Sequence, residues 1–311
     1  MEQSRKSNKK VLDIFLPGMI TAYGYRGCFP AISITGPACT LGCEHCRGYL
    51  LKSMYHTEYP EKLINLLKDL KKKGMIGALL SGGCDSQGKM PWKKFLPFLS
   101  KFNFELYLIA HGGMNISGEI AKMFKQSPIK QVLIDVIGDA ETLRDIYHIN
   151  DFEVMEKTLE NVYSAGLKVA PHVIVGLNKG KIKGEYKALD MLSKHQTERV
   201  ILVVLMPGIL KVKPPFIEDV IDVFIHARKT FKHITLGCAR PKGRYRRELE
   251  IALIEKKLVD AMALWSDEAV EKAINLGYSV NFYEGCCSIP LRKHIPILEQ
   301  SYSIGVFKGT K

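Results

Sequence analysis

No run of apolar residues in this sequence approaches the ~20 that a membrane-spanning helix needs. Residues 1–10 are basic, but residues 11–20 contain Asp13 and Pro17 and lack a small-residue cleavage site, so we expect no signal peptide. No linker rich in proline, glycine and serine divides the chain, and no segment has low complexity. We therefore expect a globular cytoplasmic protein with no membrane partner.

Acidic residues are too few to balance the basic ones. The chain has 45 lysines and arginines against 32 aspartates and glutamates, which gives a formal charge of +13. A lysine-rich solvated surface explains such an excess, and so does an acidic partner. The basic residues are spread out, with short clusters only at residues 71–73 and 243–247, and no nucleic-acid-binding motif is present. Nucleic acid is therefore a less favoured partner than an acidic protein.

Short runs rich in β-branched residues alternate with amphipathic helical stretches from residue 31 onward. The strands predicted in this way cover residues 31–35, 77–81, 105–110, 131–136, 167–175, 199–206, 233–237 and 260–264. A further strand-like run covers residues 278–285. The eight repeats predict an α/β fold, a (β/α)8 TIM-type barrel with an extra C-terminal strand; a doubly wound open sheet is the competing arrangement. We expect residues 1–30 to form a short N-terminal extension and residues 31–311 the barrel domain.

The eight cysteines favour metal or redox chemistry over a disulfide framework in a chain expected in the cytoplasm. Three of them, Cys39, Cys43 and Cys46, form a C-x3-C-x2-C motif directly after the first predicted strand. Four thiolates close a [4Fe–4S] cluster, so three leave one iron open to a substrate's amine and carboxylate. Gly42 lets the loop turn tightly around such a cluster. A zinc site is the alternative, but zinc needs a fourth nitrogen or sulfur ligand.

This motif after a first barrel strand resembles that of the radical S-adenosylmethionine (radical SAM) superfamily. The resemblance implies that the open iron binds SAM and that one-electron reduction cleaves SAM to a 5′-deoxyadenosyl radical, which abstracts a hydrogen from the substrate. It also implies SAM-binding residues at the strand ends. These residues are His45, Ser81, Gly82, Gly83, Asp135 and His172. The glycines could instead form a simple turn between a strand and a helix, and Asp135 and His172 could instead be hydrogen-bonded polar residues of the core.

Five cysteines lie outside the motif: Cys28, Cys84, Cys238, Cys286 and Cys287. All but Cys28 follow predicted strands, so a closed barrel would bring them to the same mouth. We predict a second iron–sulfur cluster on Cys84, Cys238 and one of the adjacent pair; a vicinal disulfide and plain core packing are the alternatives. Arg240 lies close enough in sequence to Cys238 to help hold the cluster or an anionic substrate, which makes it the candidate catalytic residue.

The whole chain resembles biotin synthase and its relatives, and most of all a subunit of the two-component lipoyl synthases. The resemblance rests on the stretches FPAISITGPACTLGCEHCRGYLL, SGGCD and GCARPKGRYR. It implies a sulfurtransferase that inserts sulfur from an auxiliary cluster at an unactivated C–H bond of an octanoyl chain. The implied partners are an acidic lipoyl-carrier protein, a second radical SAM subunit and a ferredoxin-like electron donor. A radical SAM mutase or methylase without a sacrificial cluster is the alternative enzyme, and a basic nucleic-acid-binding protein is the non-catalytic one.

Overall fold

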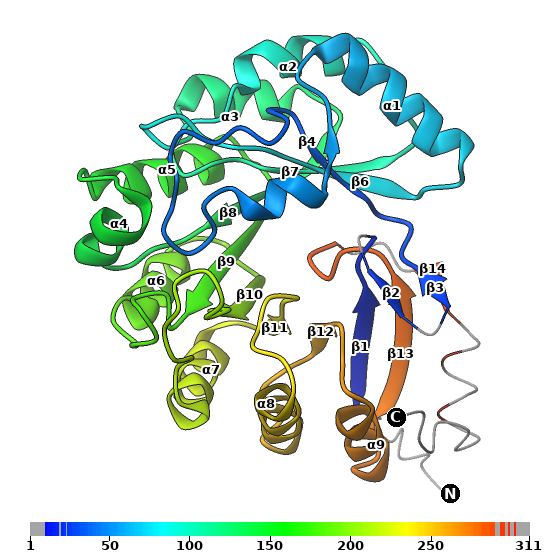
Figure 1. The fold of residues 1–311 in the computed structure, drawn as a ribbon, viewed down its shortest axis with the longest axis vertical. Coiled ribbons are helices and arrows are strands. Elements are labelled where there is room, and N and C mark those ends of the chain that lie inside the picture. Colours follow the sequence, from blue (N-terminus) through cyan, green and yellow to red (C-terminus); the bar gives the residue numbers. More distant parts are fainter. Residues whose placement is uncertain are drawn as a thin grey trace, which may run out of the picture.

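The computed structural model describes residues 10–18, 20–22, 24–289, 293–295, 298 and 302. One large curled sheet dominates these residues, and the helices lie along its outer side (Figure 1). Its strands are β1 (Val11–Leu16), β4 (Ala31–Ser33), β5 (Tyr55–His56), β6 (Gly77–Ser81), β7 (Tyr107–His111), β8 (Ile129–Asp135), β9 (Val169–Val175), β10 (Arg199–Val204), β11 (His233–Leu236), β12 (Ala261–Ala263), β13 (Ser279–Glu284) and β14 (Lys293–His294). A separate pair consists of β2 (Thr21–Ala22) and β3 (Tyr25–Arg26).

The helices follow the strands in the alternation that the sequence predicts. They are η1 (Tyr49–Ser53), α1 (Pro60–Lys72), α2 (Trp92–Leu99), α3 (Gly118–Lys125), α4 (Ala140–Tyr147), α5 (Glu153–Ser164), α6 (Glu185–Ser193), α7 (Ile217–Thr230), α8 (Arg244–Glu255) and α9 (Asp267–Asn275). In α1 the buried residues Leu63, Leu67 and Leu70 share one stripe, which packs against the sheet. Within the described ranges, no helix has the length and apolar character to cross a membrane.

The order of strands in the sheet is β14-β13-β1-β12-β11-β10-β9-β8-β7-β6-β4-β5. Neighbouring strands run parallel, apart from the antiparallel pair β13 and β14. Each strand predicted from residue 31 onward is present in the expected order, and the run at residues 278–285 is the extra strand β13. The predicted TIM-type α/β fold is therefore confirmed, as a half-barrel whose end strands β14 and β5 do not pair with each other (Figure 1).

The sequence reasoning did not predict strand β1, which lies within the expected N-terminal extension. β1 pairs with β12 on one side and with β13 on the other, both in parallel. Its residues VLDIFL are a short apolar run before Pro17, which is typical of a buried strand. Asn281 of β13 donates a hydrogen bond to the Asp13 carboxylate across this ladder, at 3.0 Å. The division at residue 30 stays a prediction, but residues 11–16 are part of the main sheet.

The segment after β13 runs back through the inside of the curled sheet. Ile289 is fully buried there among Ile109, Leu133 and Ile201 of the central strands. The Gln131 side-chain amide donates a hydrogen bond to the Ser288 carbonyl oxygen at 2.9 Å, which ties the segment to β8. The inner space of the half-barrel is therefore partly filled by the chain's own residues 286–289.

Candidate functional site

The cysteine motif lies in the loop that follows β4, at the carboxyl edge of the sheet. The backbone folds back on itself there, because the Cys43 carbonyl oxygen accepts hydrogen bonds from the N–H groups of Cys46 (3.1 Å) and Arg47 (2.7 Å). Gly42 has a φ of +61°, so the tight turn expected at this glycine is present. The potential ligand atoms of Cys43, His45 and Cys46 all lie within 4.8 Å of one another.

The thiols of this loop have the chemistry of metal ligands. A hydrogen bond from the Cys43 thiol lowers the pKa of Cys46 to about 4, with a further contribution from His45, and the same pairing raises the pKa of Cys43. Metals bind the thiolate form, so the loop holds one thiolate ready at neutral pH. The buried Nδ1 of His45 has no hydrogen-bond partner in the described residues. This sulfur-rich donor set fits an iron–sulfur cluster held by Cys39, Cys43 and Cys46.

The glycine strip after β6 packs against the cysteine loop. The Gly83 N–H donates to the Thr35 hydroxyl at 2.7 Å, and a Cβ on Gly83 would lie 2.0 Å from the Ala38 carbonyl oxygen and 2.5 Å from the Cys39 Cα. The close approach that requires glycine is thus between two protein segments. The neighbouring Ser81 and Gly82 lie on the same strip, and the contact of this strip with SAM stays a prediction.

Three ionisable side chains meet where the carboxyl ends of β7 and β8 lie beside the middle of β9. The Nε2 atom of His111 lies 3.6 Å from Oδ1 of Asp135, and Asp135 is aligned with His172 in the β8–β9 ladder. Burial acts to raise the pKa of Asp135, but the two histidines outweigh it and lower the pKa to about 2. Burial acts to lower the pKa of His111, yet the Asp135 carboxylate raises it overall. Asp135 is therefore a carboxylate paired with a readily protonated His111.

His172 differs from His111 in its hydrogen bonding. Its Nδ1 lies 3.0 Å from the Ala170 carbonyl oxygen and must donate, because a carbonyl can only accept. Burial lowers the pKa of His172 and keeps the ring neutral, so its Nε2 is an acceptor. The predicted SAM-binding residues Asp135 and His172 are thus brought together, while the sequence reasoning did not single out His111. The sequence could have indicated His111, because it is a polar residue at the end of a predicted strand and is followed by two glycines.

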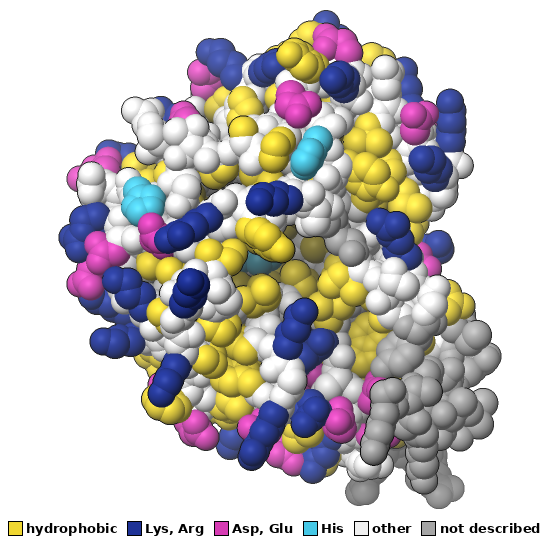
Figure 2. Space-filling model, viewed as in Figure 1, with side chains coloured by type: hydrophobic (Ala, Val, Ile, Leu, Met, Phe, Trp, Pro, Cys, Tyr) yellow, Lys and Arg dark blue, Asp and Glu magenta, His cyan; other side chains and the backbone are white. Residues whose placement is uncertain are grey.

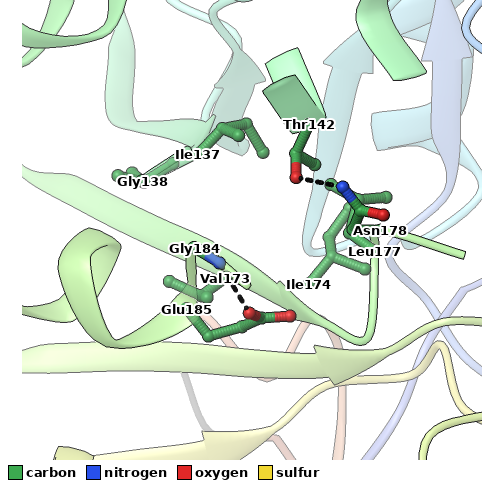
Figure 3. Close-up of a pocket in the computed structure, with 10 residues that line it drawn as sticks. Ile137, Gly138, Thr142, Val173, Ile174, Leu177, Asn178, Gly184 and Glu185 are labelled. Carbon is green, nitrogen blue, oxygen red and sulfur yellow. Dashed lines mark hydrogen bonds between the residues drawn. The ribbon is translucent and has the colours of Figure 1, made fainter. Parts of the chain in front are cut away.

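A small pocket opens at the carboxyl ends of β8 and β9, beside the start of α4. Its lining is mostly apolar, with the Asn178 amide donating a hydrogen bond to the Thr142 hydroxyl at 3.0 Å across one side (Figure 3). The buried Glu185 carboxylate accepts hydrogen bonds from the N–H groups of Gly176, Lys183 and Gly184, which fixes the loop between β9 and α6. At its other end, α4 contacts the cysteine loop, where the rings of Tyr147 and His45 lie 5.1 Å apart.

Cys84 lies with the first cysteine motif and not with Cys238. Its carbonyl oxygen accepts hydrogen bonds from the N–H groups of Thr40 (2.9 Å) and Leu41 (3.1 Å). Burial and the neighbouring Cys39 raise the pKa of its thiol to about 12, so Cys84 stays protonated. The predicted grouping of Cys84 with Cys238 and the adjacent pair is wrong, because the glycine strip holds Cys84 against the motif loop.

Cys238, Cys286 and Cys287 form a second group. Cys238 follows β11 and is exposed, whereas Cys286 and Cys287 follow β13 and are half-buried and buried. Desolvation by the surrounding protein, and then the nearby Cys286, raise the pKa of Cys238, although the residue stays accessible to solvent. All three are free thiols in the structure, so the vicinal disulfide is not formed.

Arg240 has a different environment from the one predicted. Its guanidinium donates to Glu250 through Nε and Nη2, to the carbonyl oxygens of Gly237 and Ala263 through Nη1, and to that of Leu264 through Nη2. These contacts use all five N–H groups of an arginine. The predicted contact of Arg240 with a cluster or an anionic substrate is therefore wrong, since no donor is left for one. Arg240 instead anchors the loop that carries Cys238.

Comparisons with known proteins agree with this site. Residues 33–183 match the family model of the radical SAM superfamily. No curated protein matches the sequence. Among solved structures, methylornithine synthase (PylB) is 13% identical over 98% of this chain and 84% of that chain, with a TM-score of 0.51. Streptococcus suis SuiB bound to S-adenosylmethionine is 13% identical over 82% of this chain and 58% of its own, with a TM-score of 0.51. At this identity the two structures support the fold alone, and the family match identifies residues 33–183 as a radical SAM superfamily domain.

Proposed function

We propose that this radical SAM enzyme inserts sulfur at an unactivated C–H bond, as one component of a lipoyl synthase that acts on an octanoylated carrier domain. The observation that carries the proposal is the presence of a second group of thiols outside the cysteine motif. Cys39, Cys43 and Cys46 follow β4, and Cys238 and Cys286 follow β11 and β13. The second group of thiols would hold the auxiliary iron–sulfur cluster that donates the sulfur.

The residues of the first group would hold the cofactors. Cys39, Cys43 and Cys46 would bind a [4Fe–4S] cluster, which when bound supplies the electron that cleaves SAM. Asp135 is ionised and can accept hydrogen bonds from ribose hydroxyls.

The inner wall of the half-barrel favours an alkyl substrate. Ile109, Leu133, Ala170 and Ile201 form a buried apolar cluster there, which Ile289 covers, and the half-buried Ile174 packs at its border. Abstraction of hydrogen from an alkyl chain needs no general acid or base, but it needs a dry site that protects a radical. The half-buried Ile174 is the apolar side chain of this group that stays accessible to such a substrate.

The carboxyl edge also has the charge to receive an acidic carrier. Exposed lysines project from the loops that follow β9, β10 and β11, among them Lys179, Lys181, Lys211, Lys213 and Lys242. Figure 2 shows Lys and Arg side chains around a central hollow whose visible lining is mainly hydrophobic. Complementary charge accelerates the encounter of two proteins and orients them. An acidic lipoyl-carrier protein and a ferredoxin-like donor both fit this edge, and a second radical SAM subunit completes the proposed system.

The test is sulfur insertion itself together with a count of iron. After anaerobic reconstitution, the enzyme with its partner subunit, SAM, a reductant and an octanoylated carrier domain should add sulfur to the carrier, as measured by mass spectrometry. A Cys39→Ala/Cys43→Ala/Cys46→Ala variant should lose this activity but keep about four irons. If the variant keeps no iron, the second site is absent and a radical SAM mutase or methylase replaces the proposed activity.

A further inference from the structure

The two adjacent cysteines after β13 face different surroundings. Gly285 has a φ of +130°, and its N–H donates to the Leu16 carbonyl oxygen at 3.0 Å, so the chain turns sharply at the end of β13. Cys286 then packs on the inner apolar cluster formed by the strands from β7 to β10, where it is half-buried. Its sulfur lies 3.1 Å from the Ser288 hydroxyl oxygen. Cys286 therefore borders the inner space of the half-barrel.

Cys287 is pressed against the opposite wall of that space. It is only 5% exposed and packs with Phe15 of β1, Ala261 and Ala263 of β12, and Tyr283 of β13. Its carbonyl oxygen accepts a hydrogen bond from Arg199 at 3.3 Å, which holds the peptide in this orientation. A metal centre needs room beside its ligand, whereas Cys287 is packed among apolar side chains of β1, β12 and β13.

Cys238 lies one residue from the apolar cluster on which Cys286 packs. The residue after it, Ala239, packs on the same apolar cluster as Cys286, and the Ala239 carbonyl oxygen accepts from the Val204 N–H at 2.8 Å. The Arg240 network fixes the other end of this short loop through the Gly237 carbonyl oxygen. Cys238 is thus an exposed thiol on a rigid loop at the edge of the space that Cys286 borders.

We infer that Cys238 and Cys286, and not Cys287, supply thiolate ligands of the second iron–sulfur centre. Two thiols carried by separately anchored loops beside one apolar cluster suit a soft metal centre. Cys287 acts as a small apolar residue that fills the wall formed by β1, β12 and β13. The inference rests on the proposed function, which requires that second centre, and it adds the choice between two neighbouring cysteines.

The test uses the full chain in the Cys39→Ala/Cys43→Ala/Cys46→Ala background, where any iron left belongs to the second centre. Cys286→Ala and Cys287→Ala are compared in this background after anaerobic reconstitution, by iron and labile sulfide per chain and by visible absorbance. Cys286→Ala and Cys238→Ala should each lose nearly all of the remaining iron. Cys287→Ala should keep it, and Cys28→Ala is the matched control for the removal of a buried thiol.

Alkylation followed by peptide mass analysis gives a second measurement that does not depend on the variants folding. In the iron-free chain, Cys238 and Cys286 should react, and reconstitution should protect both. Loss of iron in Cys287→Ala with iron kept in Cys286→Ala overturns the assignment, as does alkylation of Cys286 at equal rates with and without iron. A background variant that binds no iron at all refutes the proposed second centre itself, and the assignment falls with it.

Discussion

Replacement of Arg240 by methionine should destabilise the protein without any contact with substrate. The side chains of Arg240 and Glu250 are 1% and 0% exposed, so the variant leaves a buried carboxylate without its main partner. Removal of one partner from a buried ion pair costs about 3–5 kcal/mol, because the remaining charge loses its compensation. Arg246 and Ser266 also contact Glu250, at 2.8 Å and 2.7 Å. These remaining contacts favour the lower end of that range, about 3 kcal/mol.

Urea unfolding followed by circular dichroism measures this loss directly. A change of about 3 kcal/mol should lower the unfolding midpoint in urea with an unchanged slope, and it corresponds to a fall in Tm of roughly 6–12 °C. Arg240→Lys should be intermediate, because lysine keeps the charge but offers three donors in place of five.

Arg244 is the matched control, since it begins α8, the helix that carries Glu250, and pairs with Glu248 four residues later. The two side chains are 84% and 47% exposed, and exposed pairs of this kind add little to stability. Arg244→Met should leave the midpoint unchanged within the error of the fit. Equal shifts in Arg240→Met and Arg244→Met would refute the reasoning from burial.

Two further predictions concern the first site. The pKa of Asp135 is lowered to about 2 from an ordinary 3.8, which stabilises the folded state above about pH 4 by on the order of 2 kcal/mol. This contribution is lost as the pH falls towards 2. Asp135→Asn should therefore make the free energy of unfolding less dependent on pH between about 4 and 2. An identical pH dependence in both proteins, measured by urea unfolding, contradicts the pairing with His111. Gly83→Ala should reduce the iron bound at the first motif, because the new Cβ displaces Cys39. Gly208→Ala is the control and should bind the same iron as the parent protein, because a Cβ on Gly208 meets nothing within 4 Å. Full iron in both variants contradicts the packing argument.

The strands and the metal motif were predictable because they depend on local patterns. Runs such as residues 199–206 are apolar and β-branched without interruption, as expected of parallel strands covered on both faces. The three cysteines of the motif are ligands by virtue of their spacing, which a single loop determines.

The grouping of distant residues was not predictable in the same way. Cys84 and Cys238 both end strands, but which thiols meet depends on how the glycine strip and the β11–α8 loop are anchored. Arg240 lies two residues from Cys238 in sequence, yet its partners come from α8 and from the end of β12. Proximity along the chain therefore gave the wrong role for Arg240, because the direction of a side chain depends on contacts far away in sequence.

The place of β1 in the sheet has a consequence for how the chain folds. β1 comes first in the chain, but its two neighbours are formed by residues 261–263 and 279–284. Such long-range pairing slows folding, because the entropy of closing a large loop is lost before the contacts between the strands stabilise the structure. As the chain leaves the ribosome, the apolar segment 11–16 stays unpaired until strands about 250 residues later have been synthesised. During that interval it is exposed to aggregation or to binding by a chaperone.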